Sequence, residues 1–220
     1  MAGRVHLVRH AEGLHNLRRD LEIADAQLTH RGHDAAEALG RQFVKDSTDS
    51  VGAIFASPLR RTIETSLETF HRVLSPAHYP HNSGKGARAW GVSLILNPDL
   101  QEISDYPCNT GSAPADLLAE FPELKSQIQS LPPKWFEKEG DWEPTDEAVI
   151  ARKSRILKLL WITSQQLQSA TDAEQKKRSD IVVVTHEGII LTLVPNADIQ
   201  LASYKTFTLS KDAQGKISLI

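Results

Sequence analysis

Two short apolar runs in this 220-residue chain each end in a histidine. Residues 5–8 lead into Arg9 and His10, and residues 181–185 lead into His186. Short runs rich in β-branched residues are typical of strands buried in a parallel sheet. The carboxyl ends of such strands meet at one edge of the sheet, where ligands of open α/β folds bind. The two histidines are therefore expected to lie together at that edge.

Patterns typical of strands and helices alternate along the rest of the chain. Apolar runs predict strands at 51–56 and 92–96, and helical spacing predicts helices at 28–44, with Thr29 as its cap, at 59–71 and at 149–167. Residues 204–209 and 215–219 predict one or two last strands, antiparallel at an edge. This alternation predicts an α/β fold, a three-layer α/β/α sandwich with a mostly parallel sheet.

The segment between Asn97 and Thr145 contains seven prolines and two short helical pieces, near 114–120 and 123–130. We interpret it as a cap, at about 98–145, inserted over the site. The length of the chain favours one catalytic domain spanning residues 1–220. Residues 74–90, with two prolines and two glycines, predict a surface loop.

Charge and cysteine content narrow the possible partners. The net charge of -3 is close to balance, which argues against nucleic acid or an anionic membrane as partner. The single cysteine, Cys108, excludes an internal disulfide and a cysteine-based zinc site and fits a reducing compartment. No run approaches the ~18 apolar residues of a membrane span, so we expect a soluble, cytoplasmic protein. The histidines repeat no metal-ligand spacing, so no metal is expected, and the sequence does not specify an oligomeric state.

Five polar residues are expected close to the strand ends: Arg9, His10, Arg61, Glu102 and His186. Such a collection of charges is hard to justify as packing unless an anion lies among them. Arginine offers a rigid fork of donors that matches phosphate oxygens, and these charge-assisted bonds are strong. The sequence therefore predicts a small phosphorylated substrate.

The same residues predict a reaction that needs no metal or cofactor. Nearby cations disfavour protonation of His10, so a neutral ring keeps a lone pair for attack on phosphorus. Arginines would stabilise the equatorial oxygens during in-line displacement. Glu102 is the predicted acid for the leaving oxygen and the predicted base for water in the second half of the reaction.

Four segments resemble the motifs of a known family. Residues 7–12, Leu-Val-Arg-His-Ala-Glu, with Asn16 six residues after the histidine, resemble an Arg-His-Gly motif and its downstream asparagine. Residues 57–65 are similar to a second-arginine motif in which the fifth position, Arg61 and not Arg60, is functional. Residues 100–102 resemble the acid motif and residues 183–188 the second-histidine motif. The chain thus resembles the histidine phosphatase superfamily, which includes cofactor-dependent phosphoglycerate mutase, and residues 100–111 most resemble a fungal phosphoglycerate mutase-like branch.

The resemblance implies a phosphoglycerate mutase-like fold and a phosphatase mechanism. It implies that His10 accepts the phosphoryl group and that Glu102 donates the proton. The groups that it implies for holding the phosphoryl oxygens are Arg9, Asn16, Arg61 and His186.

Two departures from the motifs, together with the composition of the cap, define the alternatives. Ala11 replaces the motif glycine, and one extra methyl is expected to be tolerated. Glu187 replaces a small residue and is expected to raise the pKa of His186 or to repel substrate. A mutase is the nearest rival to a phosphatase, although the cap has no obvious basic residues for a second phosphate. A protein that kept the fold but lost phosphoryl transfer, as a binding protein or a non-phosphoryl enzyme, is the third possibility.

Overall fold

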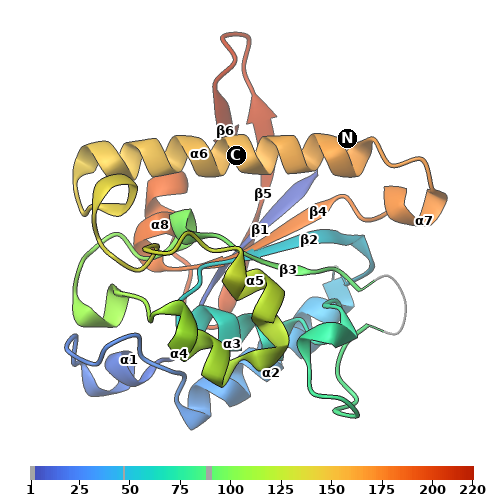
Figure 1. Ribbon diagram of the computed structural model, residues 1–220. Coiled ribbons are helices and arrows are strands. Elements are labelled where there is room, and N and C mark those ends of the chain that lie inside the picture. The colour runs from blue at the N-terminus through green and yellow to red at the C-terminus, as the bar shows by residue number, and fades with distance from the viewer. Residues whose placement is uncertain (1–2, 47, 88–90) are drawn as a thin grey trace.

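The computed structural model describes residues 3–46, 48–87 and 91–220 and contains one six-stranded sheet (Figure 1). The strand order is β3-β2-β4-β1-β5-β6. Four neighbouring strands pair in parallel: β3 (Leu94–Leu96), β2 (Val51–Ala56), β4 (Asp180–Thr185) and β1 (Arg4–Arg9). Two strands continue the sheet in antiparallel fashion: β5 (Ser203–Lys211) and β6 (Ile217–Leu219). The predicted mostly parallel sheet with antiparallel strands at an edge is confirmed.

Helices cover both faces of the sheet, which confirms the three-layer sandwich (Figure 1). One face packs against α2 (His30–Asp46), α3 (Arg60–Thr69), α4 (Pro114–Glu120) and α5 (Lys125–Gln129). The other face packs against α6 (Asp146–Gln168) and α8 (Glu187–Leu193). Two short helices complete the described set: α1 (Leu14–Arg18) and α7 (Ala173–Lys176).

Burial on both faces explains why β4 is apolar from Ile181 to Val184. Val182 and Val184 belong to the core beneath α2 and α3, whereas Ile181 and Val183 belong to the core beneath α6. Successive side chains of a strand point to opposite faces, so both sets must be apolar. The continuous run that predicted this strand is therefore the expected signature of a central position in the sheet.

The carboxyl ends of three strands are tied together by backbone hydrogen bonds. The amide of His10 donates to the carbonyl of Thr185 at 3.1 Å, and the amide of Ser57 donates to the carbonyl of Val184 at 3.0 Å. The residues that follow β1, β2 and β4 therefore begin at one edge of the sheet, as the sequence predicts.

The proline-rich segment lies between β3 and α6 and contains the two predicted helical pieces, α4 and α5. Leu117, Leu124 and Ile128 from this segment join the core beneath α2 and α3. A side chain at Gly111 would collide with the fully buried indole of Trp135, so glycine permits this close packing. The division into one domain with a cap stays a prediction.

The structure differs from the predicted elements mainly at their ends. Strand β3 begins at Leu94, and Val92 makes only an isolated bridge with Leu74. The apolar run after His186 is a helix, α8, and the hairpin of β5 and β6 projects beyond α6 (Figure 1). The predicted loop at 74–90 contains a short 3-10 turn, Pro76–His78, and its residues 88–90 lie outside the described part of the chain.

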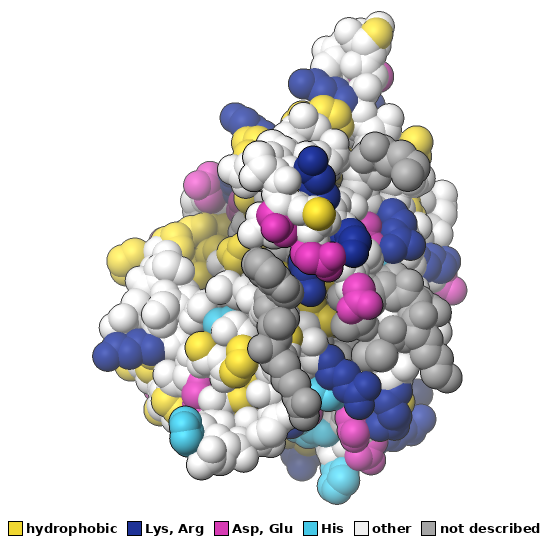
Figure 2. All heavy atoms as spheres, turned by 90° about the vertical axis from the view of Figure 1, so that its right-hand side faces the viewer, with side chains coloured by type: hydrophobic (Ala, Val, Ile, Leu, Met, Phe, Trp, Pro, Cys, Tyr) yellow, Lys and Arg dark blue, Asp and Glu magenta, His cyan; other side chains and the backbone are white. Residues whose placement is uncertain are grey.

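Basic and acidic side chains are interspersed on the face drawn in Figure 2. This mixture agrees with the near balance of charge in the sequence. Among the described helices, none has both the length and the apolar character needed to cross a membrane.

Candidate active site

Arg61 lies between the two histidines that follow β1 and β4. Its Nε donates to Nε2 of His10 at 3.2 Å, and its Nη2 contacts Nδ1 of His186 at 3.0 Å. The two imidazole rings are 5.1 Å apart, and the exposed fractions are 1% for Arg61, 4% for His10 and 0% for His186. The structure therefore brings these three predicted residues into one buried cluster. Arg60, in contrast, is paired with Glu120 at 2.8 Å.

The hydrogen bonds define which nitrogen of each ring carries the proton. Nδ1 of His10 is 2.7 Å from the carbonyl oxygen of Ala11, which can only accept, so Nδ1 is protonated and Nε2 keeps its lone pair. Arginine can only donate, so Nδ1 of His186 is the acceptor and its Nε2 donates to Oγ of Ser57 at 2.9 Å. The lone pairs of both rings face the guanidinium group.

Burial and charge keep both rings neutral. Burial, and next the charge of Arg61, hold the pKa of His10 well below its usual value. The same causes, in the same order, lower the pKa of His186. A neutral His10 has the free Nε2 that attack on phosphorus requires.

The anchors of Arg61 are two residues that the sequence did not point to. Its Nη1 donates to the carbonyl of Cys108 at 2.6 Å, and its Nη2 donates to Oδ1 of Asn109 at 2.9 Å. The described hydrogen-bond acceptors of Arg61 are therefore these two anchors and the two histidines. All of them are uncharged. Removing a cation from water costs several kcal/mol unless a counter-charge compensates. A bound anion would supply that counter-charge.

Arg9 lies at the end of β1 but is held by a carboxylate. Its two terminal nitrogens donate to the two carboxylate oxygens of Glu187, each at 2.9 Å, and Nη1 also reaches the carbonyl of Ile199 at 3.2 Å. Its Nε is buried and has no hydrogen-bond partner among the described residues. The expected effect of Glu187 on His186 is wrong, because Glu187 pairs with Arg9 and the pKa of His186 is lowered.

Helix α1 supplies Asn16 and a third imidazole. Oδ1 of Asn16 accepts from the amide of Gly13 at 3.0 Å, which fixes the side chain and leaves the amide Nδ2 as a donor. The ring of His15 is 6.0 Å from the ring of His10. Burial, and next the charge of Arg61, lower the pKa of His15 to about 4.

Glu102 is held at the start of helix α8, next to His186. Its Oε1 accepts from the amide of Ile103 at 2.8 Å, and its Oε2 accepts from the amide of Gly188 at 3.3 Å. A Cβ atom at Gly188 would collide with Oε1 of Glu102, so the position requires glycine. The predicted acid is thus held by the amide that lies two residues after the second histidine.

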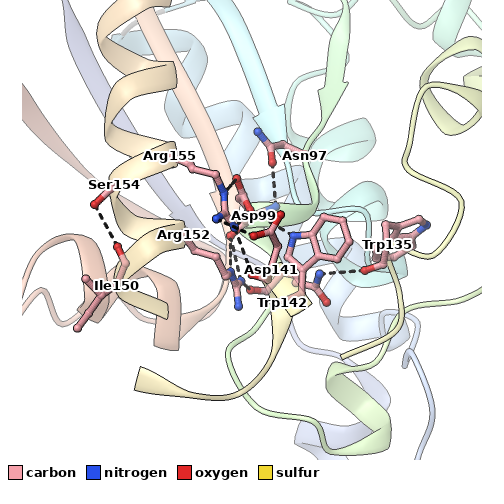
Figure 3. A network of polar contacts seen from close by, with 10 residues as sticks. Asn97, Asp99, Trp135, Asp141, Trp142, Ile150, Arg152, Ser154 and Arg155 are labelled. Carbon is pink, nitrogen blue, oxygen red and sulfur yellow. Dashed lines mark hydrogen bonds and ion pairs between the residues drawn. The ribbon is translucent and has the colours of Figure 1, made fainter. Parts of the chain in front are cut away.

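The backbone before Glu102 is fixed by two arginines of α6 (Figure 3). Arg155 binds both carboxylate oxygens of Asp99, at 2.7 and 2.9 Å. The fully buried Arg152 donates to the carbonyl oxygens of Asp99 and Gln101. In addition, Oγ1 of Thr185 donates to the carbonyl of Leu100 at 2.7 Å, which ties this segment to the end of β4.

Lys138 is a cation beside Glu102 that the sequence did not indicate. Its Nζ donates to the backbone carbonyl of Glu102 at 2.8 Å. Burial, and next the charge of Arg152, lower the pKa of Lys138 to about 7. The proline-rich segment therefore does bring a basic side chain to the site. Among the described residues, no cluster of three or more histidine, cysteine or acidic side chains is arranged to hold a metal ion.

Comparisons with known proteins agree with this architecture. The sequence model of the histidine phosphatase superfamily (branch 1) matches residues 5–78. The chain is 27% identical to phosphoglycerate mutase-like protein 1 of Arabidopsis thaliana, over 84% of this chain and 68% of that protein. It is also 27% identical to a probable phosphatase of Schizosaccharomyces pombe, over 70% of this chain and 65% of that protein.

A solved structure shows the same fold. The mycobacterial glucosyl-3-phosphoglycerate phosphatase in complex with VO3 superposes with a TM-score of 0.59, at 18% identity, over 100% of this chain and 97% of that one. The chain is thus similar to the histidine phosphatase superfamily over residues 5–78, and its fold is that of the mycobacterial phosphatase. The curated proteins that it resembles include two phosphoglycerate mutase-like proteins of Arabidopsis thaliana.

Proposed function

We propose that the protein is a metal-independent phosphatase that hydrolyses a small phosphomonoester through a phosphohistidine at His10. The observation that carries this proposal is the buried guanidinium of Arg61, which has only uncharged acceptors and faces the lone pair of His10 Nε2. A phosphoryl dianion bound there would compensate the cation and place phosphorus beside the nucleophile.

In the first half of the reaction, Nε2 of His10 attacks phosphorus as the bond to the ester oxygen breaks. Arg61 donates to the non-bridging oxygens, and Nδ2 of Asn16 and Nε of Arg9 are free donors for the same group. His186 lies against Arg61 and completes the set of oxygen ligands when its Nε2 N–H passes from Oγ of Ser57 to a phosphoryl oxygen. Glu102 donates its proton to the leaving oxygen, which departs as an alcohol.

In the second half, water attacks the phosphohistidine. Glu102, now a carboxylate, takes a proton from the water as the nitrogen–phosphorus bond breaks. Inorganic phosphate leaves, and His10 and Glu102 return to their first states. The hydrogen bond from His10 Nδ1 to the carbonyl of Ala11 keeps the ring oriented through both steps.

A mutase is the second candidate, and Lys138 is the observation that favours it. No basic residue for a second anionic group was obvious in the sequence of the cap, yet Nζ of Lys138 donates to the backbone carbonyl of Glu102. A protein that retains the fold without phosphoryl transfer is less well supported, because the residue that suggested it, Glu187, is occupied by Arg9.

The proposed substrate is a small phosphorylated metabolite. Neither nucleic acid nor a membrane is proposed as a partner. The structural relative with glucosyl-3-phosphoglycerate phosphatase in its name supports that class. A cytoplasmic location is also part of the proposal and is supported by the unpaired thiol of Cys108.

The test is to incubate the protein with p-nitrophenyl phosphate in the presence of a chelator and to trap the intermediate. Acid-labile, base-stable phosphoprotein is expected in the wild type and not in His10→Ala. Glu102→Gln is expected to trap label while turnover slows. No label in the wild type, or full activity in His10→Ala, contradicts the proposal. Interconversion of phosphoglycerates without release of phosphate would instead support the mutase.

A further inference from the structure

His15 has no assigned role in the family resemblance, yet its ring lies beside that of the proposed nucleophile. Its ring is 6.0 Å from that of His10, and the residue is 6% exposed. Its charge would lower the pKa of both His10 and His186, so its ring is within electrostatic range of both. The pocket therefore contains three imidazoles around Arg61.

The ring of His15 is held in place by close packing against Gly13. A Cβ atom at Gly13 would lie 2.8 Å from Nδ1 and 2.9 Å from Cε1 of His15. Only glycine at this position leaves the ring room beside the backbone. The packing fixes the ring while making no hydrogen bond to it.

Neither nitrogen of the His15 ring has a described protein partner. Nδ1 is buried and unpartnered, and no described hydrogen bond involves Nε2. Buried polar groups are nearly always hydrogen-bonded, and leaving one unpaired costs on the order of 1–3 kcal/mol. A residue needed only to fill space at this position would be apolar. The unpartnered ring is therefore evidence for a ligand.

Electrostatics determine what ligand the ring can take. Arg61 on α3 and the rings of His10 and His186 are the charged or titratable groups near it, and burial, followed by the charge of Arg61, lowers the pKa of His15 to about 4 and keeps the ring neutral. A neutral imidazole carries one N–H donor, which suits an anionic oxygen. A bound dianion would also offset the charge of Arg61.

We propose that His15 is a third imidazole ligand of the phosphoryl group and donates an N–H to one of its non-bridging oxygens. The inference rests on the proposed function for the identity of the anion. It adds to the site a donor from α1, adjacent in sequence to Asn16. The step involves hydrogen bonding only, so no bond is made or broken at His15.

The experiment measures binding of inorganic phosphate and of vanadate to the full chain by calorimetry, together with kcat and KM for p-nitrophenyl phosphate. His15→Phe removes the donor and is expected to weaken phosphate and vanadate binding about 10-fold, the size of one hydrogen bond. His15→Gln keeps a donor and is expected to restore binding to within about 3-fold. His30→Gln on α2 is the control, since that side chain is exposed, and its binding is expected to be unchanged.

Melting temperatures separate ligand binding from packing. If His15→Phe does not fold, His15→Met serves as the apolar variant. Unchanged phosphate binding in a folded apolar variant overturns the proposal, and so does equal weakening in His15→Gln and His15→Phe. Binding is measured independently of turnover. If the wild type shows no turnover but its phosphate binding still depends on His15, the proposed function is refuted and this inference is not. Normal turnover and binding in His15→Phe refute this inference alone.

Discussion

Nε of Arg61 lies 3.2 Å from Nε2 of His10, so the guanidinium group donates to the atom that is proposed to attack phosphorus. The same side chain also binds Cys108 and Asn109. When phosphate enters, the donor can pass from the nucleophile to a phosphoryl oxygen without leaving its anchors. The nucleophile and its main cation are thus positioned as one unit.

The first prediction concerns this unit. Arg61→Lys should lower kcat/KM for p-nitrophenyl phosphate by about 10²- to 10³-fold, since one ammonium cannot contact all these acceptors at once. Steady-state kinetics on a variant shown to be folded measures the loss. Arg60→Lys is the matched control and should stay within about 2-fold, because Arg60 pairs with Glu120 instead. A loss below about 3-fold in Arg61→Lys would contradict the assignment.

The second prediction concerns the position of the acid. Gly188→Ala should displace the carboxylate of Glu102, since the new methyl group would collide with Oε1. Turnover of alkyl phosphates, whose leaving oxygen needs a proton, should fall at least 10-fold, whereas p-nitrophenyl phosphate should lose less. The ratio of kcat for the two substrates is the measurement. Glu102→Gln should show the same substrate dependence, and an equal loss for both substrates would argue against an acid role.

The third prediction concerns the carboxylate that holds Arg9. The Glu187 side chain is 54% exposed, so the ion pair is expected to be modest and sensitive to salt. Glu187→Gln should free the charge of Arg9 for the phosphoryl group and lower KM by roughly 1.5- to 5-fold at low ionic strength. The difference from wild type should shrink as salt is added. A higher KM in Glu187→Gln would mean that the carboxylate orients Arg9 for binding instead.

The fourth prediction concerns stability and pH. Oε2 of Glu64 accepts from the amide of Leu28 at 2.7 Å, and burial raises the pKa of Glu64 from 4.5 to about 7. The folded state therefore favours the protonated form, so the stabilisation is present below pH 4.5 and is lost as the pH rises through about 7. Glu64→Gln mimics the protonated form. At pH 8 this variant should have a higher melting temperature, and its unfolding free energy should exceed that of the wild type by on the order of 1–3 kcal/mol. Near pH 5 the two proteins should differ little.

Thermal denaturation at the two pH values measures this difference. The control is Glu37→Gln on α2, which removes a carboxylate whose side chain is 57% exposed. Equal effects of Glu64→Gln at pH 5 and pH 8 would show that Glu64 does not titrate in this range.

The sheet and the strand-end residues were predictable because burial on both faces leaves a strong sequence signal. Central strands such as β4 carry a continuous apolar run, and the polar residues that follow the run mark the edge where the site lies. This reasoning located His10 and His186. Helix α8 was not identified as a helix, because the short apolar run after His186 fits either period.

Several features of the site carry no comparable signal. The acceptor at Cys108 is a backbone carbonyl, which every residue has, so no residue type marks it. Lys138 is separated from Glu102 in the sequence by a segment that includes α4 and α5, so their contact depends on how that segment folds back. The pairing of Arg9 with Glu187 depends on how β1 and α8 meet. Such contacts follow from tertiary geometry, which no local pattern in the sequence encodes.

The burial of Arg61 has a consequence for the affinity of the site. Its anchors immobilise the side chain when the chain folds, so the conformational entropy of a long flexible group is not lost a second time when a ligand arrives. The cost of desolvating the cation is likewise borne by the empty protein. Binding of an oxyanion should therefore increase the unfolding free energy of the whole protein. The stability of the folded state then depends on the concentration of free phosphate in solution.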